Sequence, residues 1–184
     1  MKDVKFWRYY IPSVNGVEGW GVFLIDSTGM FAAVTDYGNA AYMWDHHGKD
    51  DIREFFAKGL SGGFLLQKLF YDLKEYDRDE TLKRVKENIL QCRHERYFDR
   101  DKAREEWDLL NEHDDLYYEI DFNRWYEDTS LPDAGDHFTK GYPSPAKAFV
   151  NKLFPRFSEA VAEELKNEFE LPKAIESTEQ TQAV

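Results

Sequence analysis

The stretch from residue 19 to residue 44 constrains the fold more than any other part of this sequence. It reads GWGVFLIDSTGMFAAVTDYGNAAYMW, which is three apolar segments joined by two short turns that contain Gly29 and Gly38. Turns this short join neighbouring antiparallel strands, and glycine accepts the left-handed backbone that they require. The stretch therefore predicts a three-stranded antiparallel meander, and its short turns fix the register of the strands.

The first strand of this meander is apolar on both faces. Trp20, Val22 and Leu24 point to one side, and Phe23 and Ile25 point to the other. Strands with two apolar faces are usually covered on both sides. We therefore expect a central strand with both faces buried and with Trp20 in the core.

The rest of the chain predicts one more strand and several helices. Residues 5–11 form an aromatic segment that ends at Pro12, a pattern typical of an edge strand. Apolar spacing indicates helices at about residues 51–59, 64–70, 80–96, 99–113 and 144–172. The N-caps predicted for four of them are Asp50 or Asp51, Asp79, Asp99 and Ser144. Pro155 should kink or break the last of these helices. Residues 114–129 fit a strand and a helix equally, and the sequence leaves that choice open.

Together these elements predict an α+β fold, with an N-terminal antiparallel β-meander of three to five strands packed against four or five α-helices. The 184 residues fit one domain over residues 1–172. The remaining residues, 173–184, are polar and are expected to form a disordered tail.

Composition excludes several classes of protein. A formal charge of −12 disfavours binding to nucleic-acid phosphates. No apolar run approaches the ~18 residues that a membrane span needs, so we expect no membrane association. The single cysteine, Cys92, has no partner for an internal disulfide, which favours a reducing compartment and a cytoplasmic location. Its place on an apolar helix stripe indicates a core residue.

The charge is concentrated in one segment. Residues 105–136 hold twelve Asp or Glu residues and one Arg, a local balance of −11. Such a segment is either a solvated face or a surface that docks on a basic protein. A solvated face is the simpler interpretation; in the docking interpretation, the aromatic residues among these acids supply buried anchors. The candidate protein-binding residues are Glu112, Asp114, Asp115, Tyr117, Tyr118, Glu119 and Trp125.

Histidines suggest a second kind of site. His46 and His47 follow the meander, and Asp136 and His137 lie in a later loop. If the chain brings these four residues together, they could bind a metal ion and support a metal-dependent hydrolase. The spacing is weak evidence, and solvated or structural histidines are the simpler interpretation. The sequence has no phosphate-binding P-loop, dinucleotide motif, esterase motif or zinc-spaced cysteine pair, so it predicts no cofactor.

Four stretches carry a resemblance to a known family: WGVFLIDSTGMFAAVTDYGNAAYMW, DIREFFA, ETLKRVKENIL and AREEWDLL. They resemble a family of small, uncharacterised proteins of tailed bacteriophages and prophages, over about residues 18–165. The resemblance implies a phage or prophage origin and a role inside the bacterial host cell. It implies no activity, catalytic residue or cofactor.

These observations favour an accessory protein without catalytic activity that binds a host or phage protein through its acidic surface. Two alternatives stay open: a metal-dependent hydrolase with a His/Asp site, and a virion or assembly component. The sequence does not define the partner beyond a possible basic surface, and it does not predict the oligomeric state.

Overall fold

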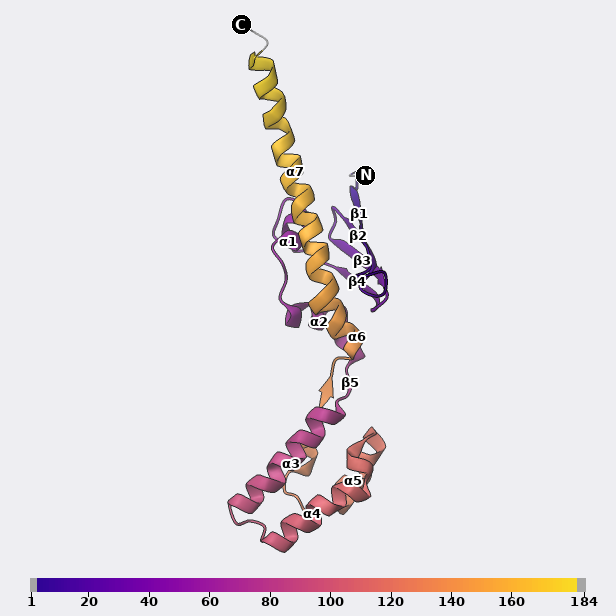
Figure 1. Cartoon of the computed structure of the whole chain (residues 1–184), viewed down its shortest axis with the longest axis vertical. Helices are drawn as coiled ribbons and strands as arrows, with labels where there is room; N and C mark the ends of the chain where they lie inside the picture. The colour runs from indigo at the N-terminus through magenta and orange to yellow at the C-terminus, as the bar shows by residue number, and fades with distance from the viewer. Residues whose placement is uncertain (1–2, 182–184) are drawn as a thin grey trace. The chain divides into compact units, whose positions relative to one another are not determined.

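The computed structural model describes residues 3–181, and it describes side chains up to residue 170. The chain forms two compact units, shown in Figure 1: residues 1–72 with 143–184, and residues 73–142. A single domain over residues 1–172 stays a prediction, because this division does not show whether the units fold together. The predicted disordered tail also stays a prediction. Residues 182–184 lie outside the described part of the chain, and the residues before them are described by backbone alone.

The first unit is built on a four-stranded antiparallel sheet. Its strands are β1 (Phe6–Ile11), β2 (Gly21–Asp26), β3 (Met30–Thr35) and β4 (Gly38–Met43), paired in chain order. Val22 lies opposite Val34 across the central pair. The predicted meander and the predicted edge strand are both confirmed, and so is the α+β class.

The turn between β2 and β3 shows why the meander forms locally. The Asp26 carboxylate accepts hydrogen bonds from the backbone N–H of Thr28 at 2.8 Å and of Met30 at 3.0 Å. Gly29 has φ +107°, and a Cβ there would collide with the carbonyl of Trp44. The close approach of the β4 end therefore requires glycine at this position.

Helices cover the inner face of the sheet. They are α1 (Ile52–Ala57), α2 (Gly62–Leu69), α6 (Ser144–Ala148), the π-helical turn η4 (Phe149–Leu153) and α7 (Phe154–Thr181). Asp51 and Ser61 cap α1 and α2 through their side chains, and Asp51 is one of the two residues predicted to cap α1. Phe23 of β2 stacks on Phe157 of α7, with ring centroids 4.4 Å apart. The core of this unit is an aromatic cluster between sheet and helix.

The predicted break at Pro155 takes a specific form. The helical hydrogen bonds change to a π-helical turn over Phe149–Leu153, and the N–H of Phe154 donates to the carbonyl of Phe149. Proline has no N–H to donate, so the helix cannot keep its regular pattern up to Pro155. Helix α6 begins one residue earlier than expected, because Pro143 occupies the N-cap position and Ser144, the predicted N-cap, is the first helical residue.

The outer face of the sheet is open to solvent, so the prediction that both faces of β2 are covered is wrong. Leu24 is 39% exposed and Val34 is 54% exposed, whereas Phe23 and Ile25 are fully buried. Trp20 is half-buried and precedes the strand. We call the outward side chains of the four strands the outer sheet face, with Val22, Leu24 and Val34 at its centre.

The second unit is helical. It contains β5 (Glu75–Tyr76), α3 (Arg78–His94), α4 (Arg100–Glu112), the short turn η2 (Asp114–Leu116), α5 (Glu119–Asp128), the short turn η3 (Ala134–His137) and β6 (Lys140–Gly141). Its core joins Val85 and Ile89 of α3 to Leu110 of α4 and Trp125 of α5. Cys92 is also buried there, as predicted.

Three local features of this unit were left open or not predicted correctly from the sequence. Residues 119–128 are helical, which settles the choice left open for residues 114–129 in favour of a turn and a helix. The pair of two-residue strands β5 and β6 was not predicted, because it lies in segments that look like plain connections. Asp77 rather than Asp79 caps α3, through a bond from the N–H of Glu80.

Candidate protein-binding surface

Helices α4 and α5 of the second unit are joined by a left-handed turn. Asp114, Asp115 and Leu116 have φ values of 51°, 50° and 54°. The left-handed conformation costs an L-residue about 1–2 kcal/mol, and aspartate tolerates it better than leucine. Three such residues in succession are unusual, and backbone strain of this kind concentrates at functional sites.

Surrounding contacts hold this turn in place. The Leu116 side chain is fully buried in the core of the unit. The Tyr76 hydroxyl donates to the Leu116 carbonyl at 2.9 Å, and the Leu116 N–H donates to the carbonyl of His113 at 2.9 Å. The Asp121 carboxylate accepts from the N–H of Tyr118 at 2.8 Å, which fixes the start of α5. These contacts fix the backbone at both ends of the turn.

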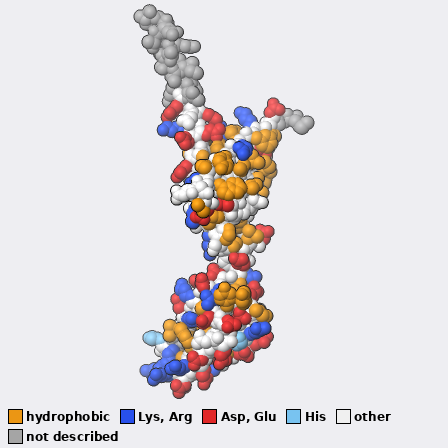
Figure 2. Space-filling model, turned by 45° about the vertical axis from the view of Figure 1, so that its right-hand side comes forward, with side chains coloured by type: hydrophobic (Ala, Val, Ile, Leu, Met, Phe, Trp, Pro, Cys, Tyr) orange, Lys and Arg blue, Asp and Glu red, His pale blue; other side chains and the backbone are white. Residues whose placement is uncertain are grey.

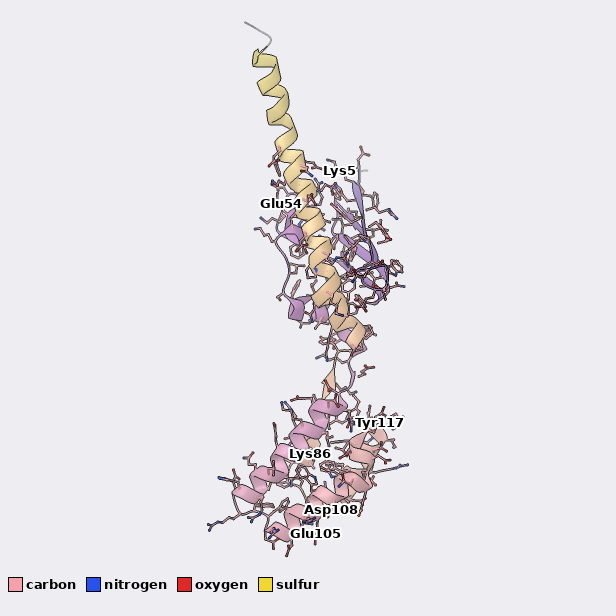
Figure 3. The ribbon with its side chains drawn as sticks, viewed as in Figure 1. Lys5, Glu54, Lys86, Glu105, Asp108 and Tyr117 are labelled. Carbon is pink, nitrogen blue, oxygen red and sulfur yellow. The ribbon has the colours of Figure 1, made fainter. Side chains whose placement is uncertain are left out.

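The turn presents an aromatic pair to solvent. Tyr117 is 56% exposed and Tyr118 is 64% exposed, and their ring centroids are 4.7 Å apart. Figure 3 labels Tyr117, together with Lys86 and Asp108 on the neighbouring helices. Acidic side chains and one exposed isoleucine surround the pair. We call this set the acidic–aromatic surface; it comprises Glu112, Asp114, Tyr117, Tyr118, Glu119 and Ile120.

Two cations of α3 border this surface. Lys86 lies 3.5 Å from the carboxylate of Asp115, and the Arg78 guanidinium lies 5.3 Å from the centroid of the Tyr117 ring. Both contacts are at least partly exposed and contribute little to stability. Lys86 and Arg78 thus lie at the edge of the surface. Among the described residues, no ion pair includes Glu112, Asp114 or Glu119.

The structure places six of the seven candidate residues at or near the protein surface and buries the seventh. Trp125 is fully buried among the core residues of the second unit, so it cannot serve as an exposed anchor. Asp115 is half-buried against Lys86, whereas the other five are exposed. Ile120, which was not a candidate, joins them with 53% exposure.

One buried carboxylate that supports this region was not predicted. Glu106 is 2% exposed and connects α4 to the end of α5. Its carboxylate accepts from the Thr129 hydroxyl at 2.6 Å and from the Ser130 N–H at 3.1 Å, and Lys102 lies 3.0 Å away. Burial by itself would raise the pKa of Glu106, but these hydrogen bonds outweigh burial and lower it. The sequence did contain a signal for its burial, because Glu106 lies between Ala103 and Leu110 on the apolar stripe of α4.

The histidine candidates show no grouping as a metal site. His46 is almost fully exposed beside Asp45 in the first unit, whereas Asp136 and His137 belong to the second. The Nε2 atom of His137 lies 2.7 Å from the Nδ2 atom of Asn88, and burial lowers the pKa of His137. Among residues 3–170, no three His, Cys, Asp or Glu side chains are placed to hold a metal ion together, and His47 is in no such group.

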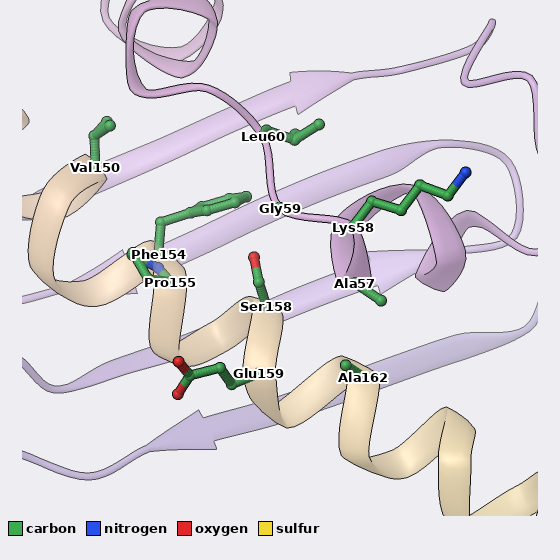
Figure 4. A pocket seen from close by; sticks show the side chains of 10 residues that line it. All are labelled: Ala57, Lys58, Gly59, Leu60, Val150, Phe154, Pro155, Ser158, Glu159 and Ala162. Atoms are coloured by element: carbon green, nitrogen blue, oxygen red, sulfur yellow. The ribbon is translucent and has the colours of Figure 1, made fainter.

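A hollow of about 290 Å³ in the first unit was the other place to search for a site. Figure 4 shows it between α7 and the segment around Gly59, with the Ser158 hydroxyl pointing into it. Ser158 is 7% exposed, and its hydroxyl has no hydrogen-bond partner among the described residues. The lining is mostly apolar and includes Phe154 and Pro155. The lining also includes Lys58 and Glu159, but among the described residues neither side chain makes a hydrogen bond to the Ser158 hydroxyl.

Comparison with known protein families agrees with the sequence resemblance. The model of the phage family Phage_phiTE_072 matches residues 2–163. The chain belongs to this phage family. The predicted phage origin is thereby confirmed, and the match covers both compact units of the phage protein. No curated protein and no solved structure matches the sequence. Within residues 3–181, no helix has the length and apolar character to cross a membrane.

Proposed function

We propose that this phage protein binds a host or phage protein through the acidic–aromatic surface and that it acts by binding, without catalysis. The observation that carries the proposal is the left-handed turn at Asp114–Leu116, which holds Tyr117 and Tyr118 exposed among carboxylates. Residues of this kind, on a rigid support, are what protein interfaces use as anchors.

Energetics support this interpretation of the turn. A left-handed backbone at three non-glycine residues costs stability, and two exposed tyrosines gain little from burial in the free protein. Neither feature helps the chain to fold. Both become favourable when a partner covers the tyrosines, because burial of aromatic rings contributes strongly to binding.

Charge indicates the class of partner. Glu112, Asp114 and Glu119 would accelerate the approach of a basic surface and repel an acidic one. Nucleic acid is disfavoured for the same reason. We place the encounter in the cytoplasm of the bacterial host, in keeping with the phage family and the single cysteine.

The test is capture of the partner with matched charge variants. The variant Glu112→Lys/Asp114→Lys/Glu119→Lys should lose partners that the wild-type protein captures from infected host cells. The control Glu87→Lys/Glu95→Lys/Glu105→Lys changes the net charge equally at exposed positions outside the surface, and it should retain them. Equal loss in both variants would show a nonspecific charge effect and contradict the proposal.

Tyrosine variants separate anchoring from charge. Tyr117→Ala/Tyr118→Ala should reduce capture while leaving the unfolding free energy within about 1 kcal/mol of wild type, because both side chains are exposed. Tyr97→Ala is the matched control, since Tyr97 is 68% exposed elsewhere in the second unit. Full capture by the double variant would remove the tyrosines from the interface.

A further inference from the structure

A hollow of about 340 Å³ lies between helices α3 and α4 of the second unit. Its apolar lining consists of Ile89, which is buried, Ala103 and Trp107, which are half-buried, and Leu90. Leu90 is 59% exposed, so this large apolar side chain contributes little to the core of the unit. An apolar hollow of this size with a few polar groups around it is the usual form of a binding site.

Three arginines line the same hollow. Arg93 comes from the last turn of α3, and Arg100 and Arg104 come from α4. Asp108 also lines the hollow, 3.9 Å from Arg104, and both of these side chains are mostly exposed. Among the described residues, no ion pair includes Arg93 or Arg100. Figure 2 shows Lys and Arg side chains gathered at the end of the second unit where α3 ends and α4 begins. We call this site the arginine hollow.

The place of Arg100 is not explained by stability. Arg100 is the first residue of α4, where the helix dipole favours an anion and disfavours a cation. Arg93 suits the end of α3, but it brings a second positive charge to the same hollow, and like charges repel. An anion that enters the hollow would reduce this repulsion and complement the start of α4.

The chemistry of the lining specifies the ligand. Guanidinium groups bind carboxylates and phosphates through paired hydrogen bonds, and the apolar lining favours an apolar side chain beside that anion. A peptide that carries aspartate or glutamate next to a large apolar residue supplies both groups. A nucleic acid supplies phosphates, but the net charge of −12 disfavours a polyanion.

The arginine hollow adjoins a surface of opposite charge. Lys86 lies between the two, with its Nζ atom 3.5 Å from the Asp115 carboxylate and 5.4 Å from the centroid of the Trp107 ring. A basic partner on the acidic–aromatic surface would be repelled by Arg93 and Arg100. The arginine hollow therefore requires a ligand of its own.

We propose that the arginine hollow binds an acidic peptide segment of another protein, with an apolar side chain against Leu90 and Trp107 and carboxylates on Arg93 and Arg100. A groove between two helices is a surface that accepts the apolar face of an amphipathic segment. This proposal does not depend on the proposed function, because the two surfaces use different residues.

Selection from a random library of short peptides on the full-length protein tests the class of ligand. One class of enriched peptides should carry Asp or Glu beside a large apolar residue. The same selection on Arg93→Gln/Arg100→Gln should lose that class. Absence of the class on the wild-type protein, or its persistence on the variant, would overturn the proposal.

Fluorescence polarisation with an enriched acidic peptide measures the role of the arginines. Arg93→Gln/Arg100→Gln should weaken binding by about tenfold or more, because charge-assisted hydrogen bonds are lost. The control Arg84→Gln/Arg124→Gln changes the net charge equally at exposed positions elsewhere in the second unit, and it should bind like wild type. Equal losses in the two variants would show nonspecific attraction and overturn the proposal.

Further measurements separate this ligand from the alternatives. Glu112→Lys/Asp114→Lys/Glu119→Lys should still bind the acidic peptide, so failure of the proposed function is distinguishable from failure here. Displacement of the peptide by a single-stranded oligonucleotide would assign the hollow to nucleic acid. A wild-type dimer in sedimentation that is lost in Arg93→Gln/Arg100→Gln would assign it to a second copy. Either result would overturn the proposal.

Discussion

The two compact units use their buried interiors differently. In the first unit, the inner sheet face and α7 form an aromatic core, with Phe23, Phe31 and Phe157 fully buried. In the second, the buried residues include Glu106 and Asp121, and the chain between α4 and α5 adopts a strained left-handed turn. Both units bury charged groups, since Asp26 and Arg53 are buried in the first. The difference is that the buried carboxylates of the second unit, Glu106 and Asp121, hold the backbone beside an exposed aromatic surface.

The buried carboxylates of the second unit lie beside the surface that we propose binds a partner. Glu106 ties the start of the Thr129–Ser130 segment to α4, and Asp121 fixes Tyr118 at the start of α5. Asp121 thus holds the backbone at the exposed tyrosines, and Glu106 joins α4 to the segment that follows α5. Rigid support of this kind reduces the ordering cost of binding.

The largest expected effect comes from the aromatic core of the first unit. Phe157→Ala should lower the free energy of unfolding by about 3–5 kcal/mol, because it removes a fully buried ring that stacks on Phe23. Phe169→Ala on the same helix should change it by less than about 0.5 kcal/mol, since Phe169 is 70% exposed. Urea titrations followed by circular dichroism measure both, and similar losses would show that the aromatic cluster does not stabilise this unit.

The buried carboxylate of the second unit should give the next largest effect. Glu106→Ala leaves the Thr129 hydroxyl, the Ser130 N–H and Lys102 without their acceptor, at a cost of about 2–4 kcal/mol. Glu105→Ala changes the neighbouring residue, which is exposed, and should cost less than about 0.5 kcal/mol. If the two variants unfold at the same urea concentration, the proposed role of Glu106 is wrong.

Relief of strain in the left-handed turn should have a smaller effect of opposite sign. Asp114→Gly removes the Cβ from a residue with φ 51° and should stabilise the protein by about 0.5–1 kcal/mol. The same substitution at Asp101, in the first turn of α4, should destabilise it by about 1 kcal/mol. A loss of stability in Asp114→Gly would show that the turn is not strained.

The smallest expected effect is the pH dependence that arises from His137. Burial and the nearby Arg84 lower its pKa below the usual 6.5, so the unfolded chain binds the proton more tightly than the folded one. The stabilisation is therefore complete above pH 6.5 and declines as the pH falls through 6.5 toward the folded pKa. His137→Gln should flatten this decline between pH 7 and pH 5, and an unchanged pH profile would remove His137 as its source.

The sequence predicted those parts of the fold that local chemistry determines. Short turns around Gly29 and Gly38 fixed the meander, and Asp51 and Asp99 were recognised as helix caps because capping needs only a few neighbouring residues. The prediction that both faces of β2 are covered was wrong. Alternation of side chains shows that a face is apolar, but it does not show whether anything packs on that face.

The candidate site was predicted only in part for a similar reason. Tyr117, Tyr118 and Trp125 are alike in sequence, yet the tertiary fold of α3, α4 and α5 buries only the last. Charge density located the acidic segment, since charge is a property of composition. The left-handed backbone at Asp114–Leu116 left only a weak sequence signal, because aspartate tolerates this conformation but none of the three residues is a glycine.

The rate of association with the captured partner tests the central claim most directly. We expect Glu112→Lys/Asp114→Lys/Glu119→Lys to lower the rate at low salt by about tenfold or more, and Glu87→Lys/Glu95→Lys/Glu105→Lys to change it far less. The difference should shrink in 1 M salt, where the Debye length falls to about 3 Å. Equal association rates for the two triple variants at low salt would contradict the claim that the acidic–aromatic surface binds the partner.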